Sequence, residues 1–490
     1  MERKKQETST YKHILKYTGL LGSVQMISVL ISVVRNKLTA ELVGSIGMGL
    51  NDLYSRTLEL LGNATNFGIS LSAVRRLSKL YERNDEAGIV HYIKIIRTWT
   101  FLTALLGLVL CLSLAPWLSQ ATMGNASHAT AYSWLSIMVF CSTLYGGEVA
   151  ILKGTRQLRK LASVSTLCAV FTLLITVPCY YFWGLKGVAP ALVGTSFASL
   201  LLHLRISVHL YPYRILWRLG TAWKEGNHLL RLGVAFVAAG VVASGAEMLV
   251  RAYISNVGGL SQVGFYAAGF TLTVSYARLI FVALDADYFP RLSAVVGQRE
   301  RSNQLANKQI DVLVLLMAPF LICFALLLPV VVRLLYSTEF LCVIRMVLFS
   351  LFYMYFKAIY TPIAYYPLAK GDSAIFFVME TAYSIALAVF VILGYHFGGL
   401  NGAGLGLVAA NLFDLIAIYS VYSQRYGFRF ESHTLRHCLL QGVLLLAGLL
   451  AAWQPIWIVK FPIGLTLLAL SALISWRLLT RKSKALPEEQ

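Results

Sequence analysis

Three charged residues within the apolar run 43–69 have the spacing of one face of a helix. Asp52 and Arg56 are four residues apart, and Glu59 follows after three more, so their side chains are neighbours on a helix surface. An ionisable group at the centre of a bilayer costs roughly 2.5–3.5 kcal/mol on insertion scales and normally faces a partner or an aqueous cavity. The triad is therefore either a self-neutralising contact that packs helices together or a cavity wall in which two carboxylates hold Arg56 in place.

Charged residues in other apolar runs extend this pattern. Arg278 has no acidic residue within four positions, so its partner comes from elsewhere, and a substrate anion is one candidate. Lys357 is similar, although a lysine can also extend its ammonium group to the membrane surface. Glu247 and Arg251 are four residues apart and either form a local ion pair or line a cavity. Arg35, at the end of the first predicted span, either anchors the chain at the outer interface or joins these groups.

Two further sets of acidic residues are weaker candidates. Asp285 and Asp287 precede Pro290 at the predicted inner end of the eighth span, where they would cap the helix or form a gate. Glu380 and Asp414 lie near the ends of two later spans.

The arginines fall on the first, second, seventh and eighth predicted spans. Arg56 and Arg278 are the strongest binding candidates, and Arg35 and Arg251 come next. Arginine binds phosphate groups through parallel hydrogen bonds and keeps its charge, so four guanidinium groups around one cavity would suit a phosphate or pyrophosphate. A carrier of organic cations would instead require carboxylates and aromatic side chains.

The elements that must position these residues are membrane helices. Of the 490 residues, 58% are hydrophobic and only 13% are charged, and the mean hydropathy is +0.68. Soluble domains carry roughly 25% charged residues, so the composition excludes a soluble enzyme. Runs of about 20 apolar residues can cross a bilayer, and they predict an all-α polytopic membrane protein. Fourteen spans are predicted, at 14–34, 43–69, 93–115, 132–152, 161–182, 188–210, 231–251, 263–289, 309–332, 341–367, 374–396, 402–423, 435–453 and 461–479.

The distribution of basic residues explains most of the net charge of +20. Of the 42 lysines and arginines, 32 lie in the two tails and in every second connection, and only 6 lie in the alternate connections. Such asymmetry indicates an even number of spans with both termini on the cytoplasmic side. The basic balance therefore reflects membrane topology, and we expect no nucleic-acid partner.

An internal repeat relates the two halves of the chain. Residues 76–78 (Arg-Leu-Ser) recur at 291–293, and the Gly-Leu-Lys-Gly segment 184–187 recurs as Gly-Leu-Asn-Gly at 399–402, both at an offset of 215. Equivalent connections in two six-helix units indicate a parallel repeat, as in several transporter folds. Two such lobes would enclose a central cavity.

The repeat divides the chain into four predicted regions. These are an N-lobe with six helices, an amphipathic interfacial linker helix, a C-lobe with six helices, and two appended helices with a cytoplasmic tail, at 1–210, 211–230, 231–424 and 425–490.

Sequence signatures of catalysis and cofactor binding are missing. There is no GxxxxGK[ST] phosphate loop and no HExxH motif, and the seven cysteines are scattered without a CxxC pair. The nine histidines are dispersed, and we expect none to pair at metal-ligand spacing in one helix. No connection is long enough for a separate catalytic domain. We therefore expect neither an enzyme nor a site for a metal or cofactor.

Several segments form a pattern that can be compared with known families. They are Val34-Arg35-Asn36-Lys37-Leu38-Thr39-Ala40-Glu41-Leu42-Val43-Gly44, Gly47-Met48-Gly49-Leu50, Gly68-Ile69, Ser72-Ala73-Val74-Arg75-Arg76-Leu77-Ser78, Leu152-Lys153-Gly154-Thr155-Arg156 and Asp287-Tyr288-Phe289-Pro290-Arg291-Leu292-Ser293. These segments resemble Wzx-type polysaccharide flippases of the multidrug/oligosaccharidyl-lipid/polysaccharide (MOP) exporter superfamily. The resemblance covers most of the first twelve spans.

The resemblance implies a flippase that moves an undecaprenyl-pyrophosphate-linked oligosaccharide from the inner to the outer leaflet by alternating access. The oligosaccharide would be a repeat unit of O-antigen, capsule or exopolysaccharide. A cationic central cavity would bind its pyrophosphate, and the location would be a bacterial inner membrane. Membrane lipids, a polysaccharide polymerase and glycosyltransferases are the partners that it implies.

Two alternatives belong to the same superfamily. An ion-coupled multidrug antiporter would use Glu247, Asp52 or Glu59 as its proton or sodium site. A lipid II flippase would resemble this chain at Arg35, but those flippases have an aspartate at the next position, where this chain has Asn36. A major-facilitator carrier also has a parallel repeat, but its usual Gly-xxx-Asp-Arg signature is missing from the segment 72–86.

Overall fold

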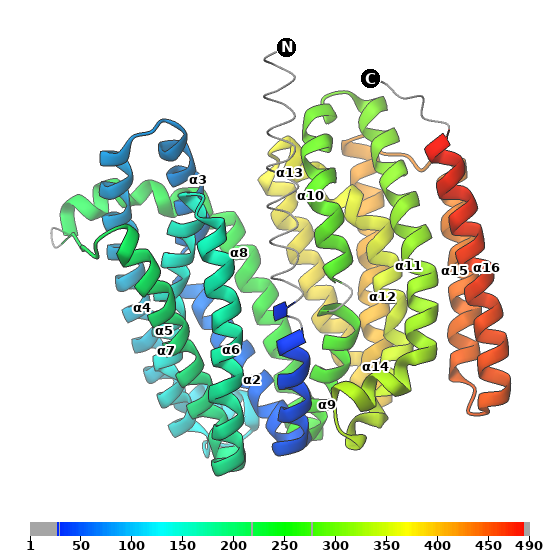
Figure 1. Ribbon diagram of the computed structural model, residues 1–490, viewed down its shortest axis with the longest axis horizontal. Helices are drawn as coiled ribbons and strands as arrows, with labels where there is room; N and C mark the ends of the chain where they lie inside the picture. Colours follow the sequence, from blue (N-terminus) through cyan, green and yellow to red (C-terminus); the bar gives the residue numbers. More distant parts are fainter. Residues whose placement is uncertain (1–26, 29, 217–218, 276–277, 485–490) are drawn as a thin grey trace. The chain divides into compact units, whose positions relative to one another are not determined.

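Helices form nearly the whole chain, and the part that the structure describes contains no strand (Figure 1). The computed structural model describes residues 27–28, 30–216, 219–275 and 278–484. Side chains are described for all of these except 71, 219–236, 275, 278–280, 282–287 and 481–484. The chain divides into two compact units, Met1–Ser261 (unit 1) and Gln262–Gln490 (unit 2).

Unit 1 is a bundle of mostly long helices. Residues 30–42 are helical. The elements that follow are α2 (Gly44–Thr65), α3 (Ile69–Glu82), α4 (Glu86–Met123), α5 (Ala129–Gly154), α6 (Leu158–Trp183), the short 3-10 helix η1 (Gly184–Gly187), α7 (Val188–Leu210) and α8 (Leu219–Gly258).

The sequence of α2 determines which of its faces is buried. Leu50, Tyr54, Leu58 and Leu61 recur every three or four residues and pack in one hydrophobic core that also contains Met248 of α8. Burial of this stripe stabilises the helix against its neighbours. Asp52 and Arg56 lie between these apolar positions and contact charged residues of α8, which packs directly on α2.

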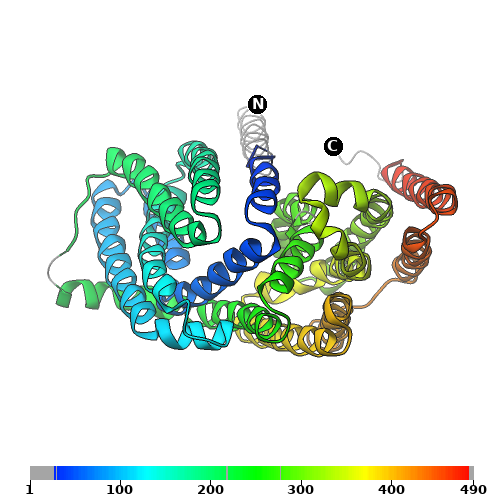
Figure 2. The same ribbon diagram turned by 90° about the horizontal axis from the view of Figure 1, so that it is seen from below.

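Unit 2 contains a second bundle and a pair of helices beside it. Its elements are α9 (Leu260–Phe270), which begins at the boundary of the units, the π-helical turn η2 (Thr271–Ser275), α10 (Arg278–Val295), α11 (Arg299–Leu335), the 3-10 helix η3 (Thr338–Cys342), α12 (Val343–Ala364), α13 (Tyr366–Lys370), α14 (Ser373–Arg425), α15 (Ser432–Trp453) and α16 (Trp457–Lys484). Seen from below, α15 and α16 lie at the edge of unit 2 (Figure 2), where both contact α11.

The helices confirm the predicted all-α membrane architecture. Every predicted span from the second to the fourteenth overlaps helical residues among those described, whereas most of the first span, 14–34, lies outside the described residues. Among the described residues, nine helical segments are long and apolar enough to cross a membrane, and two of these, Leu158–Leu210 and Ser373–Arg425, have 53 residues each. A bilayer core needs only about 20 helical residues, so each of these two segments is long enough for two crossings.

A single glycine turns α14 back on itself. Gly399 has φ 56° and ψ −142° inside the otherwise helical segment, a combination that only glycine adopts without strain. The two ends of α14 meet at Asp372, whose Oδ1 accepts from the Ile375 backbone N–H (3.4 Å) and whose Oδ2 accepts from Arg425 Nε (2.9 Å). The segment is therefore a helical hairpin, as the two separate predicted spans 374–396 and 402–423 require.

The same device appears 215 residues earlier and supports the predicted repeat. Gly184, between α6 and α7, has φ 54° and ψ −130°. A Cβ atom on Gly187 would lie 2.1 Å from the carbonyl oxygen of Cys179. The equivalent atom on Gly402 would lie 1.9 Å from the carbonyl oxygen of Gly394. Both pairs are offset by 215, so the two hairpins share their turn and their closest backbone contact.

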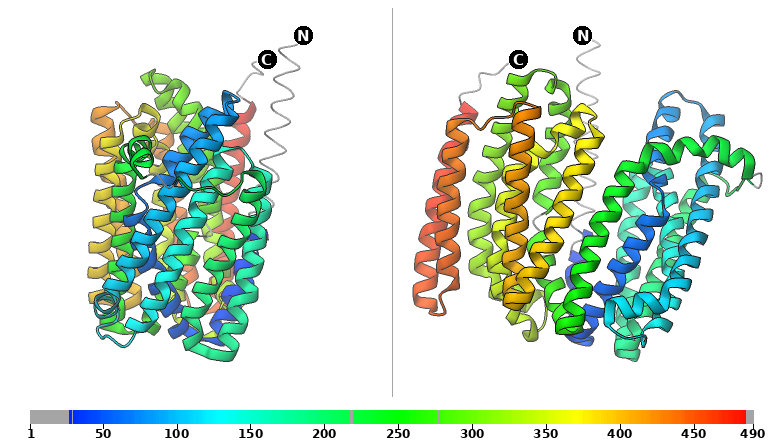
Figure 3. Two further views of the ribbon diagram at one scale, coloured as in Figure 1. Left: turned by 90° about the vertical axis from the view of Figure 1, so that its left-hand side faces the viewer. Right: turned by 180° about the vertical axis from the view of Figure 1, so that it is seen from behind.

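Two parts of the structure differ from the predicted regions. The basic connection after the second span is itself helical and contains α3. This helix was not predicted because its hydropathy is too low for a membrane span. The predicted linker helix 211–230 is not separate: residues 211–216 are not helical, and Leu219–Gly258 is one continuous helix, α8. No proline interrupts α8, so its backbone hydrogen bonds continue into the seventh span. Figure 3 shows that its N-terminal part bends and runs across the end of unit 1.

The division of contacts also differs from the predicted lobes. The predicted C-lobe begins at residue 231, whereas compactness places the division after Ser261. The physical reason is that α8 packs along α2, α3 and α4. The seventh predicted span therefore belongs to unit 1.

Candidate functional site

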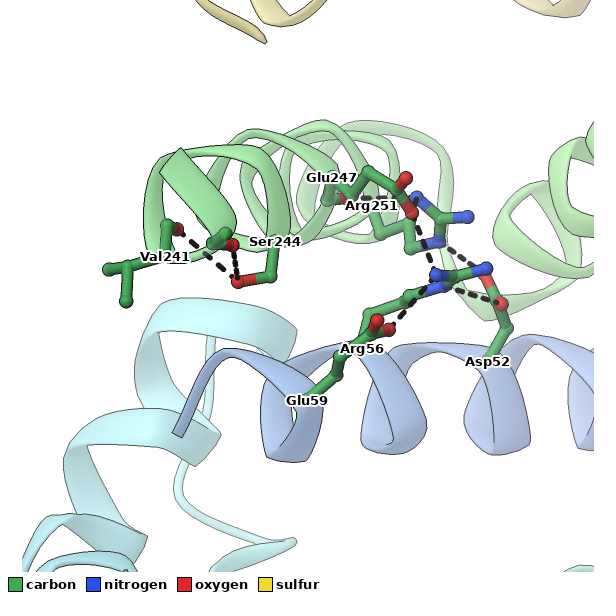
Figure 4. A network of polar contacts seen from close by, with 8 residues as sticks. Asp52, Arg56, Glu59, Val241, Ser244, Glu247 and Arg251 are labelled. Atoms are coloured by element: carbon green, nitrogen blue, oxygen red, sulfur yellow. Dashed lines mark hydrogen bonds and ion pairs between the residues drawn. The ribbon is translucent and has the colours of Figure 1, made fainter. Parts of the chain in front are cut away.

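Five charged residues of α2 and α8 form one network of ion pairs in unit 1 (Figure 4). We call it the charged cluster; its members are Asp52, Arg56 and Glu59 of α2 and Glu247 and Arg251 of α8. Sequence spacing predicted the contacts within each helix, and the packing of α8 on α2 joins the two sets.

Arg56 is the central residue of the charged cluster. Its Nη1 lies 3.0 Å from Glu59 Oε2 and 2.9 Å from Glu247 Oε2. Its Nε lies 3.6 Å from Asp52 Oδ1, which is longer than a hydrogen bond. The Arg56 side chain is 28% exposed. One accessible guanidinium is therefore surrounded by three carboxylates.

Arg251 occupies the interior of the same cluster. Its Nε donates to Asp52 Oδ2, and its Nη1 donates to the backbone oxygen of Glu247 (3.0 Å) and lies 3.5 Å from Glu247 Oε2. The Arg251 side chain is only 1% exposed. A buried guanidinium in contact with a carboxylate of another helix holds the two helices in a fixed position, and breaking such a pair is costly.

The cluster carries three carboxylates and two guanidinium groups, so its formal charge is −1 when all are ionised. Exposure is uneven: the Glu59 side chain is 50% exposed, and that of Asp52 is 18% exposed. The Asp52–Arg251 pair forms the inner part of the cluster, and the contacts of Arg56 with Glu59 and Glu247 form its outer part.

Arg35 lies in the helical residues 30–42, before α2. Its Nη2 is 3.5 Å from Asn36 Oδ1, and it interacts electrostatically with Tyr180 of α6. The Tyr180 hydroxyl donates to Asn51 Oδ1 (3.3 Å). Arg35 is thus placed near the residue that precedes Asp52, and its described contacts do not include the charged cluster.

The remaining candidates of the eighth span lie on α10. The side chains of Arg278, Asp285 and Asp287 lie outside the described residues, so only their helical backbone is placed. Pro290 is exposed. The predicted inner end of the span near Pro290 differs from the structure, because α10 continues to Val295.

Lys357 belongs to a second polar group, in unit 2. Its Nζ lies 5.8 Å from the ring centre of Tyr353, and it interacts electrostatically with Glu380 and Asp414 of α14. Tyr360, three residues after Lys357, donates to Asn411 Oδ1 (3.0 Å). Sequence reasoning did not connect these residues, because α12 and α14 approach each other only in the folded chain.

A buried ion pair that sequence spacing does not indicate fastens the chain after α7. Arg97 of α4 is 1% exposed and binds Glu148 of α5, with Nε 2.9 Å from Oε1. Its Nη1 also donates to the backbone oxygens of Tyr211 (3.1 Å) and Pro212 (2.9 Å). No sequence signal joins Arg97 to Glu148, since 51 residues separate them.

A second missed group contains two histidines. His433 and His437 are four residues apart in α15, contrary to the expectation that no histidines pair within one helix. Both contact the buried Asp311 of α11, His433 at 3.2 Å and His437 at 2.9 Å. The described residues contain no group of three or more His, Cys, Asp or Glu residues arranged to hold a metal ion. The contacts of His433 and His437 with Asp311 join α15 to α11 within unit 2.

Comparison with known proteins gives one family match and several structural matches. Residues 57–345, more than half of the chain, match the family described as polysaccharide biosynthesis protein. No curated protein matches the sequence. The lipid II flippase MurJ, in an inward closed conformation, has a TM-score of 0.70 at 14% identity, covering 94% of this chain and 99% of MurJ.

Other similar structures are transporters of the MOP superfamily. An inward-facing multidrug resistance MATE family transporter has a TM-score of 0.64 at 15% identity, covering 83% of this chain and 98% of its own. A MOP transporter from Pyrococcus furiosus, described by a reverse polarity of its binding pocket, has a TM-score of 0.56 at 15% identity, covering 83% and 93%. At such identities the likeness concerns the fold alone, which is that of transporters and flippases. By its sequence, the chain belongs to the polysaccharide biosynthesis protein family, and its fold is similar to those of MurJ and of a MATE family transporter.

Proposed function

We propose that the protein is a flippase for an undecaprenyl-pyrophosphate-linked oligosaccharide, such as a repeat unit of O-antigen, capsule or exopolysaccharide. The headgroup would cross a bacterial inner membrane from the inner to the outer leaflet by alternating access, with both termini of the chain in the cytoplasm. Family membership supports a role in polysaccharide biosynthesis. The fold supports translocation.

The observation that carries the proposal is the accessible guanidinium of Arg56 among membrane helices. A guanidinium binds a phosphate through parallel, charge-assisted hydrogen bonds. In our proposal Arg56 contacts the pyrophosphate, and Arg251, which is buried, positions the wall of the site through Asp52. Arg278, Arg35 and Lys357 are proposed as further cationic contacts.

Glycan export in cells tests this proposal. Arg56→Ala and Arg278→Ala should each reduce surface glycan strongly at normal protein levels, because each removes a cation from the anion site. Arg156→Ala is a matched control, since Arg156 forms an exposed ion pair with Glu82 away from the cluster. Normal export in both the Arg56 and the Arg278 variant would exclude the anion site.

A second candidate is an ion-coupled multidrug antiporter, and the net negative charge of the cluster favours it. Carboxylates suit a cationic drug or a coupling ion, and the fold is shared with MATE family transporters. In that case Glu247→Gln, Asp52→Asn or Glu59→Gln should abolish drug efflux. If expression of the protein does not raise the drug resistance of a drug-sensitive host, this candidate is excluded.

A lipid II flippase is the third candidate, and the fold match to MurJ favours it. Growth of cells depleted of their own lipid II flippase would separate it from the proposed function. Rescue by this chain would support lipid II transport, whereas rescue of a polysaccharide export mutant alone would support our proposal.

A further inference from the structure

We propose that Glu59 and Glu247 are built-in counter-ions, which occupy the anion site of Arg56 until the phosphate of the substrate displaces them. This inference rests on the proposed function and concerns the regulation of the same site. Two carboxylates share one nitrogen atom of Arg56, Nη1.

The outer edge of Arg56 is already used twice. Glu59 Oε2 lies 3.0 Å and Glu247 Oε2 lies 2.9 Å from the same Nη1 atom. These carboxylates come from different helices, α2 and α8. A phosphate that uses this edge of the guanidinium must therefore replace carboxylate oxygens, and binding becomes an exchange of anions.

The geometry gives each displaced carboxylate a new environment. Glu247 Oε2 also lies 3.5 Å from Arg251 Nη1, so Glu247 keeps one cationic partner when it leaves Arg56. Glu59 is half exposed, so its carboxylate can be hydrated by water. Neither group has to become a buried unpaired charge, which is the outcome that makes the loss of an ion pair costly.

The inner part of the cluster does not take part in this exchange. Asp52 binds the buried Arg251, and its distance to Arg56 exceeds that of a hydrogen bond. It therefore keeps α2 and α8 together while the outer carboxylates move. The charged cluster thus contains one structural carboxylate, Asp52, and two exchangeable carboxylates, Glu59 and Glu247.

Such an arrangement selects for strongly charged anions. A singly charged anion gains little by replacing a carboxylate of equal charge, because exposed ion pairs contribute little net stability. A pyrophosphate carries more charge and several acceptor oxygens, so it can displace both carboxylates. Discrimination by a competing group inside the protein is a known route to specificity.

Binding of inorganic pyrophosphate and of orthophosphate to the purified full-length protein, measured by calorimetry at constant ionic strength, tests the inference. Glu59→Gln and Glu247→Gln should each bind orthophosphate on the order of tenfold more tightly than the unaltered protein, and pyrophosphate more tightly by a smaller factor. The preference for pyrophosphate over orthophosphate should fall. Glu82→Gln is the control, because it removes a carboxylate from an exposed arginine ion pair outside the cluster.

The outcomes separate this inference from the proposed function. Unchanged or weaker binding in both glutamine variants overturns the counter-ion role, and so does an absence of binding in every variant. If export still requires Arg56 in that case, the proposed function survives. Because Glu59 is half exposed, Glu59→Gln gives a folded protein for this comparison even if Glu247→Gln does not.

Discussion

Gly184 and Gly399, which are 215 residues apart, adopt nearly the same glycine-specific backbone conformation, with φ near +55° in both. Each lies at the point where a 53-residue helical segment reverses its direction. Short sequence matches indicated an internal repeat, and the two glycines show the same repeat in the backbone geometry.

The conformation of Gly399 predicts a specific cost of substitution. Gly399→Ala should lower the free energy of unfolding by about 1–3 kcal/mol, because alanine is strained at this φ and ψ. A Cβ atom at this position meets no neighbour within 4 Å, so the cost is conformational and not steric. The thermal unfolding midpoint of the detergent-purified protein measures it. Gly398→Ala, also in open space and without a positive φ, should change the midpoint little.

Gly402 predicts a loss of stability by a different mechanism. A Cβ atom there would lie 1.9 Å from the carbonyl oxygen of Gly394, so Gly402→Ala must separate the two arms of α14. We expect a sharp fall in the yield of monodisperse protein, measured by fluorescence-detected size exclusion. Gly240→Ala has no neighbour within 4 Å and should keep a normal yield. Equal yields for both variants would contradict the close packing of the hairpin.

The Asp52–Arg251 pair predicts a non-additive pair of substitutions. Asp52→Asn should lower the free energy of unfolding by about 3 kcal/mol, because it weakens the pairing of a buried guanidinium. The double variant Asp52→Asn/Arg251→Met should recover part of this loss, since the buried charge is then absent. A double-mutant cycle on thermal unfolding midpoints measures the coupling. Additive effects would show that the two side chains act independently.

Arg97 predicts a change in the chain that follows α7. Arg97→Met removes the donor to the backbone oxygens of Tyr211 and Pro212, so the exposed Arg214 nearby should be cleaved by trypsin several-fold faster. Mass spectrometry of the fragments over time gives the rate. Cleavage that stays as slow as in the unaltered protein would exclude Arg97 as the group that holds this segment.

We expect protonation of Asp372 to lower the stability of the protein in acid. Hydrogen bonds from Arg425 and Tyr426 hold the pKa of Asp372 below its ordinary value of 3.8. The unfolded chain therefore takes up a proton on Asp372 at a higher pH than the folded chain. The contribution of Asp372 to stability is complete at pH values well above 3.8 and is lost as the pH falls through the lowered folded pKa. In Asp372→Asn, the unfolding midpoint should fall less between pH 5 and pH 3 than in the unaltered protein. Identical pH dependence would contradict this role.

The sequence predicted the membrane class, the spans from the second to the fourteenth and the local spacing of the charged cluster, because hydropathy and helical periodicity are local properties. The pairing of Arg56 with Glu247 was not predictable in this way, since it depends on how α8 packs on α2. The same holds for Arg97 and Glu148, which come from different helices. The continuous helix α8 was missed because a polar, Trp- and Lys-containing stretch resembles a separate interfacial helix.

The sharp turns at Gly184 and Gly399 also constrain how the chain enters the membrane. A connection of one to four residues extends at most about 14 Å, whereas the bilayer core is about 30 Å thick. One arm of such a hairpin cannot span the bilayer while the other arm remains on the side from which the first arm entered, because the connection would then have to cross the bilayer core. During biosynthesis the two arms of each hairpin must therefore insert together, as a single unit.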